Sequence, residues 1–148
     1  FLIREDIVLQ AVSTMRRAHT AIGHSLEFTP EEQAAAEERF TYDAEFLRRT
    51  VRTRARNEQR FEKMFETYGF DPVRLSYERN MNNPLGALNT IAGLIEEPLF
   101  DAVEESKFSI LRTGKSAAFA ERFRAEEARF LARIARERAP MLERLADY

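Results

Sequence analysis

Apolar residues recur at alternating steps of four and three along most of the chain. This spacing places them on one face of an α-helix. The first such segment covers residues 3–26, and its apolar line consists of Val8, Val12, Met15, His19, Ile22 and Leu26. No stretch alternates apolar and polar residues as a half-buried strand does, so we expect a helical chain without a sheet.

The longest segment with this spacing predicts one uninterrupted helix over residues 30–68. Thr29 suits its N-cap, Pro30 its first turn, and Gly69 the left-handed residue that ends it. At ~1.5 Å per residue this helix has a length of about 58 Å. Its inward line consists of Phe40, Ala44, Leu47, Val51, Arg54, Glu58, Phe61, Phe65 and Tyr68.

Two further helices complete the predicted architecture. One begins at Asn83-Pro84 and continues to Gly114, with a kink or a restart at Pro98, and the last runs from Ser116 to Met141. The short link at residues 27–29 predicts a hairpin, and the connection at 69–83 has room for a short fifth helix. We therefore predict a single domain over residues 1–148: an all-α, antiparallel four-helix bundle of two helical hairpins with an over-long second helix.

Composition limits the function classes. The chain has 148 residues, of which 44% are hydrophobic and 32% charged, and a net charge of −2, so we expect a soluble protein without a nucleic-acid partner. The absence of cysteine excludes disulfides and thiol catalysis. No apolar run is long enough for a membrane span, and we expect a cytoplasmic protein. Because the chain begins at Phe1 instead of Met, we also expect residues upstream of it.

Motifs that would indicate an enzyme are missing. There is no G-x-S-x-G sequence and no glycine-rich phosphate loop, and Gly114-Lys115-Ser116 lacks the upstream glycine because residue 109 is Ser. We therefore predict a non-enzymatic interaction or sensory module that needs no cofactor. Acidic residues crowd the first part of the long helix and basic residues the second, so two antiparallel copies are complementary. This favours a homodimer, with an unidentified protein as a further partner.

A metal site is the first alternative. Metal-ligating side chains fall on the inward lines of several helices: Glu5, His19, Glu37, Glu58, Glu127 and Glu137. They suggest a ferritin-like bundle holding di-iron or di-manganese, as an oxidoreductase or a metal carrier. However, no glutamate is followed three residues later by histidine, which is the step such sites use. A single inward histidine is more often a hydrogen-bonded core residue.

The second alternative is a small-molecule-binding helical regulator. Its pocket would lie near Arg54 and Glu58, with Phe61 and Phe65 as apolar walls and His19 as a further ligand-binding residue. The competing interpretation is an internal salt bridge between Arg54 and Glu58. A basic stripe also follows the long helix, made of Arg49, Arg52, Arg56, Arg60 and Lys63. We interpret that stripe as a solvated face, or one paired with acidic residues of the third helix.

Overall fold

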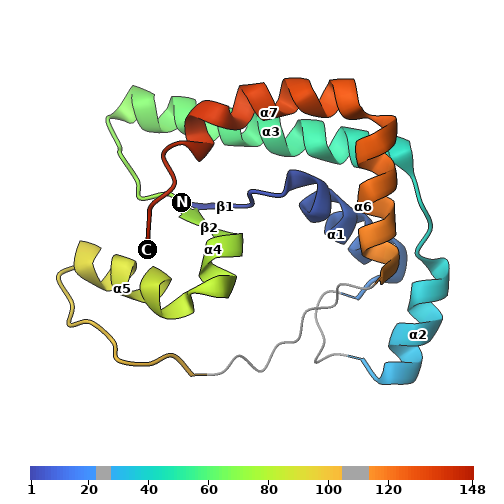
Figure 1. Cartoon of the computed structure of the whole chain (residues 1–148), viewed down its shortest axis with the longest axis horizontal. Helices are drawn as coiled ribbons and strands as arrows, with labels where there is room; N and C mark the ends of the chain where they lie inside the picture. Colours follow the sequence, from blue (N-terminus) through green and yellow to red (C-terminus); the bar gives the residue numbers. More distant parts are fainter. Residues whose placement is uncertain (23–27, 105–113) are drawn as a thin grey trace.

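The computed structural model describes residues 1–22, 28–104 and 114–148, and this part of the chain is mostly helical, which confirms the predicted class. None of its helices has the length and apolar character needed to cross a membrane. The elements, in chain order, are β1 (Leu2–Ile3), α1 (Ile7–Thr20), α2 (Pro30–Arg39), α3 (Ala44–Tyr68), β2 (Leu75–Ser76), α4 (Tyr77–Asn82), α5 (Pro84–Leu94), α6 (Gly114–Glu126) and α7 (Ala128–Leu142) (Figure 1).

The two strands form a small parallel sheet, so the prediction of a sheet-free chain is wrong. Leu2 lies opposite Leu75, and Ile3 lies opposite Ser76. The sheet is extended by a parallel bridge between Arg74 and Leu145, which follows α7. Each strand has only two residues, and a pair of residues is too short to show a period in the sequence.

The hydrophobic core surrounds α1, which packs against α3 and α6. Figure 1 shows α3 and α7 side by side along one edge of the molecule, with α6 crossing from α7 towards α1. The largest apolar side chains with almost no exposure are Phe40, Phe123, Met15, Leu47, Val12 and Val51. These side chains come from four separate segments, so the burial that holds the fold together is long-range.

The predicted long helix is broken, which corrects the over-long second helix. It divides into α2 and α3 at residues 40–43, where Phe40 has an extended backbone. Phe40 is completely buried, with its ring centroid 4.9 Å from that of Phe119 in α6. The Asp43 carboxylate then accepts the backbone N–H of Phe46 and caps α3. Burial of Phe40 and the Asp43 cap therefore stabilise the break more than residues 40–43 would gain by continuing the helix.

The other helices also differ from the predicted pattern, and the four-helix bundle is not confirmed. α5 begins at the expected Asn83 cap but ends at Leu94 instead of continuing past Pro98. The predicted last helix is divided at Glu127 into α6 and α7, which lie at a large angle to each other (Figure 1). The predicted segment at 105–113 lies outside the described residues.

One buried arginine connects α7 to α3 and to the start of the chain. The Arg138 side chain is 4% exposed, and its Nε and Nη2 atoms donate to the Glu58 carboxylate at 2.7 and 3.0 Å. The same guanidinium donates to the backbone carbonyls of Arg4 and Glu5, the latter at 3.0 Å. Arg138 thus fixes the segment that leaves β1 against α7.

Arg138→Met is expected to destabilise the protein by about 3 kcal/mol, because it leaves the Glu58 carboxylate and two carbonyls without their donor. Urea denaturation measures the free energy of unfolding. Arg136→Met, on the exposed side of α7, is the matched control and should change it little. Adding Glu58→Leu to Arg138→Met should recover part of the loss. Equal stability of the Arg138→Met and Arg136→Met variants would contradict this role for Arg138.

Tyr42, in the linker between α2 and α3, provides a pH-dependent contact with α6. Partial burial and the hydrogen bond to the Glu126 carboxylate raise the pKa of Tyr42 to about 12. The folded state therefore favours the protonated phenol, and this stabilisation is present below pH 10 and is lost as the pH rises towards 12. In a spectrophotometric titration, the difference between wild type and Tyr42→Phe should show a midpoint near this value. A midpoint at the ordinary value for tyrosine would refute the contact.

Candidate functional site

Polar side chains gather where the two parallel strands end. We call Arg4, Glu5, Ser76, Glu78 and Arg79 the strand-end cluster, because the first two follow β1 and the others end or follow β2. Since β1 and β2 are parallel, their carboxyl ends lie at the same edge of the sheet. In open α/β sheets, ligands bind outside the carboxyl ends of the strands.

Glu5 is the central carboxylate of this cluster. The fully buried Ser76 hydroxyl donates to it, and the Nε atom of Arg79 lies 3.4 Å from it. The Ser76 hydroxyl also accepts the backbone N–H of Arg79 at 3.1 Å, which caps α4. The side chains of Glu5 and Arg79 remain 38% and 36% exposed, so a bound molecule can reach both.

Glu78 holds the other side of the cluster in place. Its carboxylate accepts the Nε–H of Arg4 and the backbone N–H of Glu5, both at 2.9 Å. The Arg4 guanidinium also lies over the Tyr77 ring, 3.9 Å from its centroid. Burial raises the pKa of Glu78, but the hydrogen bonds from the Glu5 N–H and the Arg4 guanidinium lower it by a larger amount. The pKa therefore lies below its ordinary value, and this carboxyl group stays ionised.

A groove of about 860 Å³ opens beside the cluster, between α7 and the start of α1. Its polar end includes Glu5 and Asp6, and Arg124 of α6 is held there by a 2.7 Å ion pair with Asp6. Much of the rest of the wall is apolar and includes Ile7, Val8, Leu131, Ala135 and Leu142. The groove therefore joins an apolar surface to a carboxylate that can accept a proton and to arginines that can stabilise negative charge.

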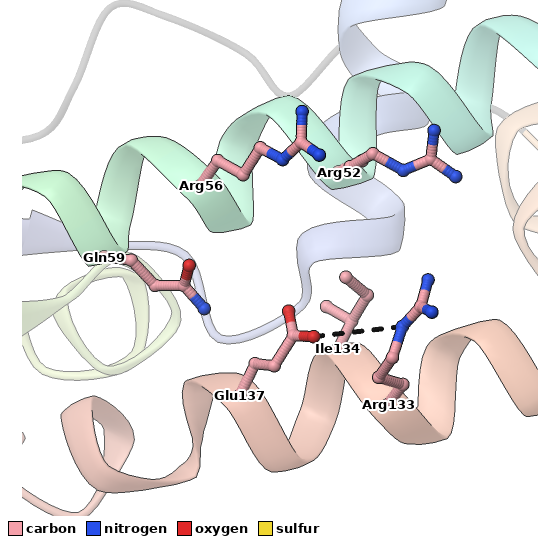
Figure 2. Close-up of a pocket in the computed structure, with 6 residues that line it drawn as sticks. All are labelled: Arg52, Arg56, Gln59, Arg133, Ile134 and Glu137. Carbon is pink, nitrogen blue, oxygen red and sulfur yellow. Dashed lines mark ion pairs between the residues drawn. The ribbon is translucent and has the colours of Figure 1, made fainter.

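A second concave region lies between α3 and α7. This arginine depression, of about 430 Å³, is lined by Arg52, Arg56, Gln59, Arg133, Ile134 and Glu137. In Figure 2 the polar side chains extend from the two facing helices, with Ile134 between them. Its charged groups are three guanidiniums and one carboxylate, so its character is cationic.

The six residues of the predicted metal site are held by other groups or lie apart. Glu37 pairs with Arg16, Glu58 with Arg138, and Glu127 with Arg48. Glu5 accepts from Ser76, and Glu137 lies 3.8 Å from Arg133. His19 Nδ1 accepts the backbone N–H of Thr41 at 3.4 Å. Within residues 1–22, 28–104 and 114–148, no group of three or more His, Asp or Glu side chains can hold a metal ion.

The predicted pocket near Arg54 and Glu58 is only partly assembled. Arg54 is exposed, whereas Glu58 lines a different depression of about 520 Å³ together with Arg138 and Met141. Phe61 and Phe65 lie elsewhere, against the ring of Phe1, with centroids 5.5 and 5.3 Å away. Arg54 and Glu58 are not paired with each other, because Arg138 binds Glu58.

Sequence analysis did not single out six residues of the site and its support: Arg4, Ser76, Glu78, Arg79, Arg124 and Arg138. Ser76 and Arg79 lie in the connection at 69–83, which carries no helical period to draw attention to it. Arg138 did carry a signal. It lies four residues after Ile134 and three before Met141, and all three are buried, whereas the neighbouring Glu137, assigned to the inward line, is exposed.

The comparison with protein families gives a match to Stf0 sulphotransferase over residues 1–126. The matched span includes both strands and the whole strand-end cluster, and it ends with α6, so α7 lies outside it. No curated protein and no solved structure matches the chain. The match overturns our prediction of a non-enzymatic interaction or sensory module, and with it the ferritin-like and regulator alternatives. The chain belongs to the Stf0 sulphotransferase family.

Proposed function

We propose that this protein takes part in sulfuryl transfer from an activated sulfate donor to the hydroxyl or amine of an acceptor. The observation that carries the proposal is the family match, which covers residues 1–126. The strand-end cluster supports it, because all of its residues lie within that span and at the edge where parallel sheets bind ligands.

Glu5 is the residue that we assign as general base. In the transfer, the acceptor oxygen or nitrogen forms a bond to sulfur, and the bond from sulfur to the donor oxygen breaks. The acceptor proton passes to the Glu5 carboxylate, which is accessible and is oriented by the buried Ser76 hydroxyl. Positioned carboxylates of this kind act within hydrogen-bond reach of the proton that they remove.

The negative charge of the donor requires cations at the same place. Arg79 lies beside Glu5, and Arg124 lies at the polar end of the adjoining groove. In the proposed reaction these guanidiniums stabilise the sulfuryl oxygens and the departing donor oxygen. The apolar wall of the groove suits the carbon skeleton of an acceptor. We also propose that residues 1–148 form a single domain.

The test is a Glu5→Gln variant, assayed for transfer of radioactive sulfur from an activated donor to a panel of hydroxylated and amine-bearing acceptors. Glutamine keeps an oxygen that accepts from Ser76 but takes up no proton, so we expect the rate to fall by about a hundredfold or more. The matched control is Glu38→Gln, an exposed position on α2, which should keep the wild-type rate.

Two outcomes would count against the proposal. Absence of transfer to every acceptor by the wild-type protein would remove the proposed activity. A wild-type rate in Glu5→Gln would instead leave sulfuryl transfer in place and reject Glu5 as the base.

A further inference from the structure

The arginine depression between α3 and α7 has no part in the proposed transfer, and its cations are largely unpaired. Within the three described ranges, Arg52 and Arg56 form no ion pair, and the carboxylate of Glu137 lies no closer than 3.8 Å to Arg133. Arginine side chains elsewhere bind carboxylates closely, such as Arg74 with Glu62 at 2.7 Å. The face therefore carries positive charge that the described part of the fold does not neutralise.

This result differs from the expectation that acidic residues of the third predicted helix would neutralise the basic stripe. Glu96, Glu97, Asp101 and Glu104 follow α5 and make no ion pair with the stripe in the part of the chain that the structure covers. The position of α5 in Figure 1 agrees, because α5 lies at the far side of the molecule from the facing helices α3 and α7.

Two arginines of the depression, Arg52 and Arg133, pack against one aromatic ring. Phe130 of α7 is 5% exposed, and the guanidiniums of Arg48, Arg52 and Arg133 lie 5.2, 5.7 and 5.8 Å from its ring centroid. Cation–π contacts and the apolar stems of these side chains cover the ring. Side chains that are already ordered lose less conformational entropy when a ligand binds, which favours affinity.

The size and chemistry of the depression indicate a small, multiply charged anion. Its volume of about 430 Å³ lies in the range of small-molecule sites. A neighbouring depression of about 590 Å³ shares Arg133 and is lined by Arg48, Arg129 and Arg136 as well as by Glu126 and Glu127, and Arg48 pairs with Glu127 at 3.2 Å. Guanidinium groups bind tetrahedral oxyanions through paired N–H donors, and the Gln59 amide adds a neutral donor and acceptor.

We propose that the arginine depression is a second binding site, for a small molecule that carries two or more phosphate or sulfate groups. Arg52 and Arg56 from α3 and Arg133 from α7 bind its oxyanions. This site goes beyond the proposed transfer, because it uses none of the strand-end cluster and half of it comes from α7, outside the span that matches the family.

The experiment is calorimetric titration of the full chain at low ionic strength with inorganic pyrophosphate. We expect saturable binding, and Arg52→Gln and Arg133→Gln should each raise Kd about tenfold, because each removes charge-assisted hydrogen bonds. Arg54→Gln is the matched control: it removes the same charge from an exposed position of α3 outside the depression, and Kd should stay unchanged. Parallel titrations with inorganic phosphate and inorganic sulfate identify which group the site prefers.

Glu137→Gln distinguishes a binding site from a merely structural role of these arginines. It removes the one carboxylate of the depression and releases Arg133, so Kd should fall severalfold. Absence of saturable binding to all three anions would overturn the proposal. So would equal losses in Arg52→Gln and Arg54→Gln, which would indicate a general charge effect. Arg52→Gln should keep the wild-type rate of sulfuryl transfer, so failure of this site and failure of the proposed transfer are separable.

Discussion

The contact between Arg138 and Glu58 is the interaction on which much of the described structure depends. A guanidinium buried to this degree costs several kcal/mol to remove from water, and that cost is offset only if its donors find acceptors. Four of the five N–H donors of Arg138 bind two carboxylate oxygens and two backbone carbonyls, from α3 and from the segment after β1, so each of its three nitrogens has an acceptor. The Arg138 charge is therefore compensated only when α7, α3 and the segment after β1 lie together as they do in this structure.

That placement also explains the geometry of the strand-end cluster. Arg138 binds the carbonyls of Arg4 and Glu5, Glu78 binds the amide of Glu5 and the side chain of Arg4, and Ser76 binds the Glu5 carboxylate. The backbone and side chain of Glu5 are thus oriented by α7 and by the residues around β2. A preorganised carboxylate needs little rearrangement when a substrate arrives, which is the property that a general base requires.

The comparison of sequence and structure separates local signals from long-range ones. The Thr29 cap, the left-handed Gly69 and the Asn83 cap all depend on neighbouring residues, and all were predicted correctly. The break at residues 40–43 depends on burial of Phe40 against α6, which no local pattern reports. Glu58 lies on a helix as expected, but its partner was not predicted, because Glu58 binds an arginine 80 residues away instead of one four residues away. The candidate site could not be predicted, since its residues meet only through a parallel pairing of two-residue strands.

The distance along the chain between Arg138 and the segment that it holds has a consequence for synthesis of the protein. Arg138 is separated from Glu5 and Arg4 by 133 and 134 residues, and β1 pairs with residues more than 70 positions later. Local helices such as α1 can form while the chain is still emerging from the ribosome. Residues 4 and 5, in contrast, gain their hydrogen bonds from Arg138 only after residue 138 has left the exit tunnel. This part of the molecule therefore reaches its folded structure late, after most of the intervening chain has been translated. During that interval the nascent chain carries an unpaired strand edge, which is a feature that favours aggregation and that chaperones shield.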